Sequence, residues 1–234
     1  KELSSNAPIG ADASYYPEAA KGAYDAVIAE VEETVADVMS LALINEGIEK
    51  LDAAKVAFLK SLNMPADGYY QIRIDGGNYL EALLYASTDA ADTEEKNGLL
   101  ARFSKGETVD DIYTDDDRFA GSVASVWYLE KGEDNTVAIR SVSTGLYLQN
   151  NLDQGNYVQM TQEKVYLPLQ ADGLKNGMSY NIIVGTDSVS GATLYGNINS
   201  GANSKTGELV SWGSAAGNDN STFRFDEVAL EEYA

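Results

Sequence analysis

A pattern of strand, glycine turn and strand occurs three times in the last two-thirds of this chain. The first strands of the three units are residues 69–73, 136–140 and 180–184. The glycine turns and second strands are residues 77–80, 145–148 and 191–194. Each unit closes on an apolar and aromatic strand, at residues 126–129, 165–167 and 223–225. One such unit cannot bury its own apolar face, so the three predict a single domain with threefold pseudosymmetry.

The composition supports a folded domain and argues against polyanionic partners. The chain has 234 residues, of which 44% are hydrophobic, which is enough for an ordinary core. Its net charge is -21, from 37 acidic and 16 basic residues. Such a surface repels nucleic acid and anionic lipid, so we expect neither as a partner. The charge is typical of a solubilising surface, and weak cation binding or a basic partner is the alternative.

The residue types that are missing restrict the chemistry. The sequence contains no cysteine and no histidine, so it lacks thiol nucleophiles, the usual general base and the usual zinc ligands. No P-loop, G-x-S-x-G or H-E-x-x-H motif occurs. Two carboxylates could in principle hydrolyse a glycoside, but 37 acids single out no pair. We therefore expect no enzyme and no cofactor.

The first 66 residues predict a helical region. Residues 1–13 are polar and are expected to form an extended arm. Pro17 suits the first turn of a helix whose apolar residues recur every three or four positions up to Val38. Ser40 is a candidate cap for a second helix, which ends before the breaker sequence at 65–68. We expect an antiparallel helical pair within a domain of residues 1–66, packing on another element or on a partner.

The remaining residues, 67–234, are predicted to form an all-β domain. Its three units are expected at residues 69–131, 136–172 and 178–229. The turns are expected at residues 75–77, 143–145 and 190–191. The first unit is longer than the others, and its insertion predicts a short helix around residues 96–103.

The second unit resembles a known family. Residues 125–130 (SVWYLE) and 138–148 (AIRSVSTGLYL) are similar to the repeat of ricin-type β-trefoil domains, in which a W-x-L strand precedes a y-x-I-r-n-x-x-t-G-k-y-L segment. The likeness covers residues 69–228. It is similar in particular to the cysteine-free trefoil-like domains of exported proteins from gut Bacteroidetes, which have small helical modules beside them. The resemblance implies a six-stranded barrel capped by three hairpins.

The resemblance also implies a function. Many ricin-type domains bind galactose-like sugars through an aspartate, an aromatic platform and an asparagine or glutamine. The Q-x-W signature of the family has lost its glutamine in all three units, and its aromatic position is expected at Trp127, Tyr166 and Phe223. We expect these three rings to fill the barrel interior. The polar site residues of the family cannot be matched here one by one.

Two groups of residues are candidates for a sugar site, because ligand sites combine apolar surface with a few polar groups. The first is Trp212 with its nearby polar side chains: Asn197, Asn199, Asn218 and Asp219. The second is Tyr157 with Asn156. The alternative for Trp212 is a partly buried structural ring, and full burial would remove it as a platform.

One acidic loop is a weak candidate for calcium. It contains Asp110, Asp111, Asp115, Asp116 and Asp117. Calcium favours several carboxylates on a flexible loop, but the spacing of a known calcium loop is absent, so a solvated loop is the better interpretation.

These features together predict a non-catalytic binding module for carbohydrate. The alternative is a structural or protein-interaction domain whose helical pair docks a partner. No apolar run is long enough to span a bilayer, so no membrane insertion is expected. The chain begins at Lys1, which we interpret as a processed product without its signal peptide. A secreted or cell-surface bacterial protein is the expected location.

Overall fold

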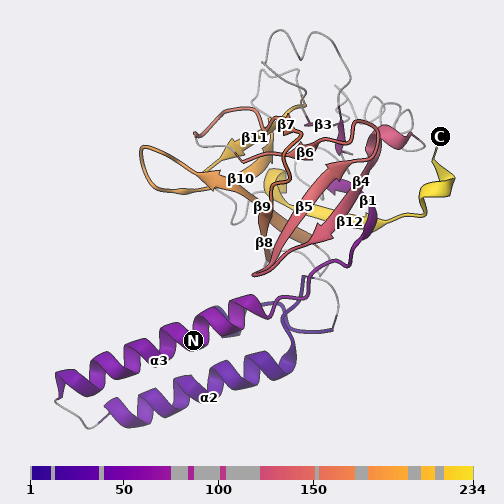
Figure 1. Cartoon of the computed structure of the whole chain (residues 1–234). Coiled ribbons are helices and arrows are strands. Elements are labelled where there is room, and N and C mark those ends of the chain that lie inside the picture. Colours follow the sequence, from indigo (N-terminus) through magenta and orange to yellow (C-terminus); the bar gives the residue numbers. More distant parts are fainter. Residues whose placement is uncertain are drawn as a thin grey trace.

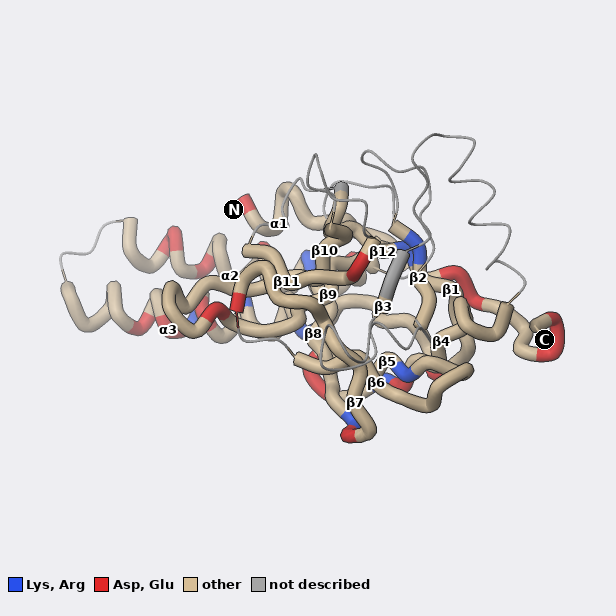
Figure 2. Tube along the Cα trace, turned by 90° about the horizontal axis from the view of Figure 1, so that it is seen from above, with Lys and Arg blue, Asp and Glu red and all other residues tan. Residues whose placement is uncertain are grey.

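The structure is a computed structural model that describes residues 2–11, 14–36, 40–74, 84–86, 101–103, 122–150, 153–171, 179–199, 207–213 and 219–233. Its N-terminal region contains α1 (Glu2–Asn6), α2 (Glu18–Val35) and α3 (Leu41–Lys60). α2 and α3 form the predicted antiparallel pair, which projects from one end of the β domain (Figure 1). The predicted extended arm is wrong in part, because residues 2–6 form α1. Figure 2 shows acidic residues at intervals along both long helices.

The helical pair is held together by a narrow apolar seam. α2 buries Tyr24, Ile28 and Val31, which recur at the helical spacing of four and three. Gly47 of α3 faces Val31, and a Cβ atom at Gly47 would lie 3.0 Å from Val31 Cγ1. The glycine therefore lets the two helices approach closely. Further along, Phe58 stacks against Tyr24, with ring centroids 5.3 Å apart.

The described β residues form three successive groups of four strands. The first group is β1 (Gly68–Ile74), β2 (Leu84–Ala86), β3 (Ala101–Phe103) and β4 (Val126–Lys131). The second is β5 (Thr136–Ser141), β6 (Tyr147–Leu148), β7 (Met160–Thr161) and β8 (Leu167–Ala171). The third is β9 (Ser179–Thr186), β10 (Thr193–Ile198), β11 (Leu209–Trp212) and β12 (Phe223–Glu227). Short 3-10 turns lie at Val123–Ser125 (η1), Asp219–Ser221 (η2) and Leu230–Glu232 (η3).

The pairing of these strands is that of a β-trefoil. β1, β4, β5, β8, β9 and β12 pair in that order, and β12 returns to β1, so six antiparallel strands close a barrel. The second and third strands of each group pair with each other as a hairpin. The chain is therefore a helical pair followed by a β-trefoil with threefold pseudosymmetry, as predicted. The short helix predicted around residues 96–103 is wrong where the structure describes it, because Ala101–Phe103 form β3.

The threefold relation is visible in the turns. Gly145 and Gly191 both have a positive φ, of 74° and 71°, which a glycine adopts without strain. The amide of Gly145 donates to the carbonyl of Ser141, and the amide of Gly191 donates to that of Asp187, each at 2.9 Å. Ser141 and Asp187 thus open equivalent turns. The corresponding turn predicted at residues 75–77 lies outside the described residues.

The barrel interior corrects one predicted core position. Trp127 lies opposite Tyr70 and Phe223 lies opposite Tyr180, and both Trp127 and Phe223 are fully buried. In the second unit, Val137 takes the place of Tyr70 and Tyr180. Leu167 lies opposite Val137 and is fully buried.

The prediction for Tyr166 is therefore wrong by one residue. Its side chain is 40% exposed. Neighbouring residues of a strand point to opposite faces, so a shift of one position reverses inside and outside.

The helical pair is joined to the end of the barrel by polar contacts. Tyr180 donates its hydroxyl to the carbonyl of Asn63 at 2.6 Å, and Asn135 Nδ2 donates to the carbonyl of Leu59 at 2.5 Å. Lys60 Nζ lies 2.7 Å from Asp134 Oδ1. None of the described helices is long and apolar enough to cross a membrane. The domain boundary at residues 66 and 67 stays a prediction.

Candidate functional site

Trp212 is a partly exposed ring at the end of β11. It lies opposite Tyr195 of β10, and its side chain is 43% exposed. Cross-strand partners in an antiparallel pair project from the same face, so Tyr195, which is half-buried, supports the tryptophan on its face of the hairpin. The condition that would remove Trp212 as a platform, full burial, is not met.

A segment of the second unit runs alongside β11. The amide of Gly155 donates to the carbonyl of Ser211 at 2.8 Å, and the amide of Ser211 donates to the carbonyl of Asn156 at 2.9 Å. Tyr157 forms an antiparallel bridge with Val210. The two candidate groups of the sequence, around Trp212 and around Tyr157 and Asn156, therefore lie on neighbouring segments. Asn156 is exposed and Tyr157 is half-buried there.

An aspartate fixes the turn beside this segment. Asp187 Oδ1 accepts hydrogen bonds from the amide of Ser190 and from its hydroxyl, each at 2.7 Å. Asp187 Oδ2 accepts the amide of Gln154 at 3.2 Å. These hydrogen bonds, the Ser190 hydroxyl first, hold the pKa of Asp187 below its usual value. Asp187 thus stays ionised and links the third unit to the second.

Gln154 connects the aspartate to the tryptophan. Its side-chain Oε1 lies 2.6 Å from the position that a Cβ atom would take on Gly213, the residue after Trp212. A side chain at position 213 would displace the end of the Gln154 side chain. Gln154 therefore contacts Asp187 through its backbone amide, and its side chain lies against the residue that follows Trp212. The three residues supply a carboxylate, an amide and an indole ring. We call Asp187, Gln154, Asn156, Tyr157 and Trp212 the Trp212 site.

The other predicted residues do not join this site in the described structure. Asn197 is 7% exposed and donates from Nδ2 to the hydroxyl of Ser221 at 2.8 Å, which is a structural role. Asn199 is half-buried, and its backbone amide donates to the carbonyl of Glu208. Asp219 begins η2, and its side chain is outside the described part. Asn218 and the calcium candidates, Asp110, Asp111, Asp115, Asp116 and Asp117, lie outside the described residues.

Two members of the site, Asp187 and Gln154, were missed by the sequence analysis. Asp187 stands four residues before the turn glycine of its own unit, while the equivalent position of the second unit is Ser141. That difference between units is a signal in the sequence. No such signal exists for Gln154, because it reaches the site from a neighbouring unit.

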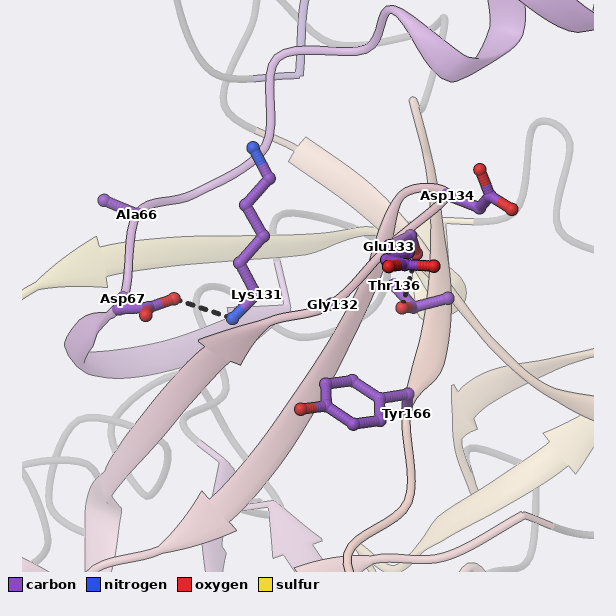
Figure 3. A pocket seen from close by; sticks show the side chains of 8 residues that line it. All are labelled: Ala66, Asp67, Lys131, Gly132, Glu133, Asp134, Thr136 and Tyr166. Carbon is purple, nitrogen blue, oxygen red and sulfur yellow. Dashed lines mark hydrogen bonds between the residues drawn. The ribbon is translucent and has the colours of Figure 1, made fainter.

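A cavity lined by described residues lies elsewhere. Its volume is about 1140 Å³, and it opens where the segment before β1 meets the turn between β4 and β5 (Figure 3). Asp67 Oδ1 accepts the backbone amide of Lys131 at 2.7 Å, as the dashed line shows. Asp134 is paired with Lys60. These polar groups join the helical pair to the barrel, so we assign the cavity a structural role.

The Trp212 site offers binding groups and no catalytic pair that we can identify. Its ring gives a flat apolar face, and its amides and carboxylate supply directed hydrogen bonds. Within the described ranges, no group of three or more acidic residues is placed to hold a metal ion. The arrangement can bind a polar ring-shaped ligand at the surface.

The sequence matches no protein-family model and no curated protein at a significant level. Several solved structures are similar in fold. A lectin of Polyporus squamosus bound to a human-type influenza-binding epitope is 14% identical, with a TM-score of 0.47 over 70% of this chain and 50% of the lectin. A ricin B-like lectin of Macrolepiota procera in complex with lactose is 14% identical, with a TM-score of 0.47 over 70% and 99%. The designed threefold-symmetric protein ThreeFoil is 17% identical, with a TM-score of 0.46 over 69% and 100%. Because these identities and TM-scores are low, the fold is assigned from the strand pairing of this chain.

Proposed function

We propose that this chain is a non-catalytic carbohydrate-binding module, and that the Trp212 site holds the sugar. The observation that carries the proposal is the exposed Trp212 ring beside the ionised Asp187 and the amides of Gln154 and Asn156. An aspartate, an aromatic platform and an amide are the groups that the resemblance to ricin-type domains implies for a competent unit. We include export or a cell-surface location in the proposal, and this part rests on the resemblance alone.

The test is a titration with lactose, a galactose-containing sugar. The chain has two tryptophans, of which Trp127 is fully buried and Trp212 is exposed. Acrylamide quenching of tryptophan fluorescence therefore reports mainly on Trp212, and bound sugar should protect it. We expect Trp212→Ala to weaken binding about tenfold or more, because buried aromatic contacts dominate small binding sites.

Tyr166→Ala is the matched control, because that ring has nearly the same exposure, 40%, on another part of the barrel. It should leave the lactose affinity unchanged. A glycan array widens the search beyond lactose. If no glycan on the array binds the chain at millimolar concentration, the proposal fails.

The second candidate function, a protein-interaction domain, is favoured by a different observation. α3 exposes five large apolar side chains: Leu41, Leu43, Ile44, Ile48 and Val56. Exposed apolar surface of this kind is typical of an interaction surface. An array without any glycan ligand would leave this function as the better interpretation.

A further inference from the structure

A row of three tyrosines and one arginine crosses the outer face of the barrel. Tyr69 of β1 lies opposite Tyr128 of β4, Tyr128 lies opposite Arg140 of β5, and Arg140 lies opposite Tyr147 of β6. We call these four residues the tyrosine–arginine row. Three strand spacings make the row about 14 Å long. Arg140 is exposed and the three tyrosines are half-exposed, so the row faces solvent.

Three side chains of the row contact one another. The rings of Tyr69 and Tyr128 meet edge to face with centroids 5.2 Å apart. The guanidinium carbon of Arg140 lies 5.6 Å from the centroid of the Tyr128 ring, within the range of a cation–π contact. This contact holds the exposed guanidinium against the Tyr128 ring. The row is thus an ordered platform with a positive charge in it.

Arg140 differs in one respect from its equivalent in the first unit. Arg73 stands at the same place in β1, and its Nε lies 3.4 Å from Asp226 Oδ2. Among the described residues, no carboxylate lies within ion-pairing distance of Arg140. The carboxylate that corresponds to Asp226 is Glu130, because each stands two residues after the partner of its arginine.

Glu130 is occupied by other groups. Lys164 Nζ lies 2.8 Å and 2.7 Å from its two carboxylate oxygens, and the hydroxyl of Tyr166 donates to it at 2.8 Å. Lys164 therefore neutralises the carboxylate nearest to Arg140. Arg73 therefore makes an ion pair with Asp226, which Arg224 also binds, while Arg140 makes no ion pair with a described carboxylate and acts on Glu130 only from a distance.

We propose that the tyrosine–arginine row binds an anionic saccharide. The sugar rings would stack on Tyr128 and Tyr147, and the guanidinium of Arg140 would accept a carboxylate or a sulfate ester through two parallel N–H donors. The positive charge of Arg140 is the reason for proposing an anionic ligand. The chain as a whole has a net charge of -21, so an exposed arginine between two half-exposed rings, without an ion pair to a described carboxylate, is unusual for its surface. This site lies on other strands than the Trp212 site, and it does not depend on the function proposed for that site.

The experiment measures binding of an oligogalacturonate and of its methyl ester to the whole chain by calorimetry, at low and at moderate salt. The ester keeps the sugar rings and removes the charge. We expect the acid to bind and the ester to bind at least about tenfold more weakly, as for loss of a charge-assisted hydrogen bond. A sulfated chondroitin disaccharide in a parallel titration distinguishes sulfate from carboxylate as the preferred anion.

Variants locate the site. Arg140→Gln should weaken binding of the acid about tenfold or more, while Arg73→Gln and Trp212→Ala should leave it unchanged. The proposal is overturned if neither anionic probe binds at millimolar concentration, if acid and ester bind equally, or if Arg73→Gln has the same effect as Arg140→Gln. It is also overturned if sedimentation shows a dimer that Arg140→Gln dissociates, because the row would then be an interface between two copies.

Discussion

Leu167 and Tyr166 are neighbours in the chain, and their opposite environments give a prediction at the scale of single residues. Leu167 is fully buried at the position that Trp127 and Phe223 take in the other units. We expect Leu167→Ala to lower the free energy of unfolding by about 2–5 kcal/mol, since it leaves a cavity in the barrel. Tyr166→Ala truncates a ring that is 40% exposed and removes its hydrogen bond to Glu130, so it should lower the free energy of unfolding by only about 1 kcal/mol. Urea unfolding of both variants decides between the two registers, and the predicted register of the sequence analysis would give the reverse order.

The same pair of residues explains why the register could not be predicted. Residues 165–167 read valine, tyrosine, leucine, and three apolar residues in succession carry no alternation from which inside and outside can be told. The larger ring was assigned to the core by analogy with Trp127. In the structure the tyrosine finds a better partner outside, because its hydroxyl donates to Glu130.

At the scale of elements, Phe58 is the buried ring that holds the helical region together. Its ring is 2% exposed and stacks on Tyr16 at 4.5 Å as well as on Tyr24. Phe58→Ala should lower the stability of the helical region by about 3–5 kcal/mol. Hydrogen exchange is the measurement: amides of α2 and α3 should exchange faster, and amides of β4 and β5 should not change. Val56→Ala, on the exposed side of the same helix, is the control and should leave all of these rates unchanged.

The elements themselves were largely predictable, and the site was not. The recurring apolar spacing gave both long helices, and Ser40 stands at the N-cap position of α3 as predicted. The three glycine-turn units predicted a domain with threefold pseudosymmetry, because each strand signal is local in sequence, and the resemblance to ricin-type domains implied the trefoil. The Trp212 site needs contacts between units, such as Gln154 with Asp187, and a single sequence contains no local signal for them. Asn197 was predicted as a ligand-binding residue because it is a polar side chain near Trp212 in the sequence. In the structure its amide makes a buried hydrogen bond to Ser221 instead.

At the scale of the whole molecule, the charge distribution predicts how stability depends on pH. Three carboxyl groups in ordered hydrogen bonds have pKa values below their usual range: Asp25 beside Lys21, Glu130 beside Lys164, and Asp187 beside Ser190. A carboxyl group whose pKa is lowered by folding stabilises the folded state above its unfolded pKa. That contribution is lost as the pH falls through the folded pKa. Acid should therefore destabilise the chain below about pH 4.

A second effect of acid acts in the opposite direction at higher pH. The chain has a net charge of -21, so its carboxylates repel one another across the folded molecule. Partial protonation of the 37 acidic residues relieves that repulsion. Because the chain contains no histidine, no side chain with an ordinary pKa titrates between about pH 6 and 8. The melting temperature should be flat in that range, rise slightly toward about pH 5, and fall steeply below about pH 4.

Differential scanning calorimetry across this range, at low and high salt, tests both effects. High salt screens the repulsion, so the rise toward pH 5 should shrink while the fall in acid remains. Asp187→Asn removes one of the ionised groups with a lowered pKa, and it should make the fall in acid less steep. A melting temperature that climbs steadily down to pH 3 in wild-type protein would mean that self-repulsion, and not the hydrogen-bonded carboxylates, governs the acid response.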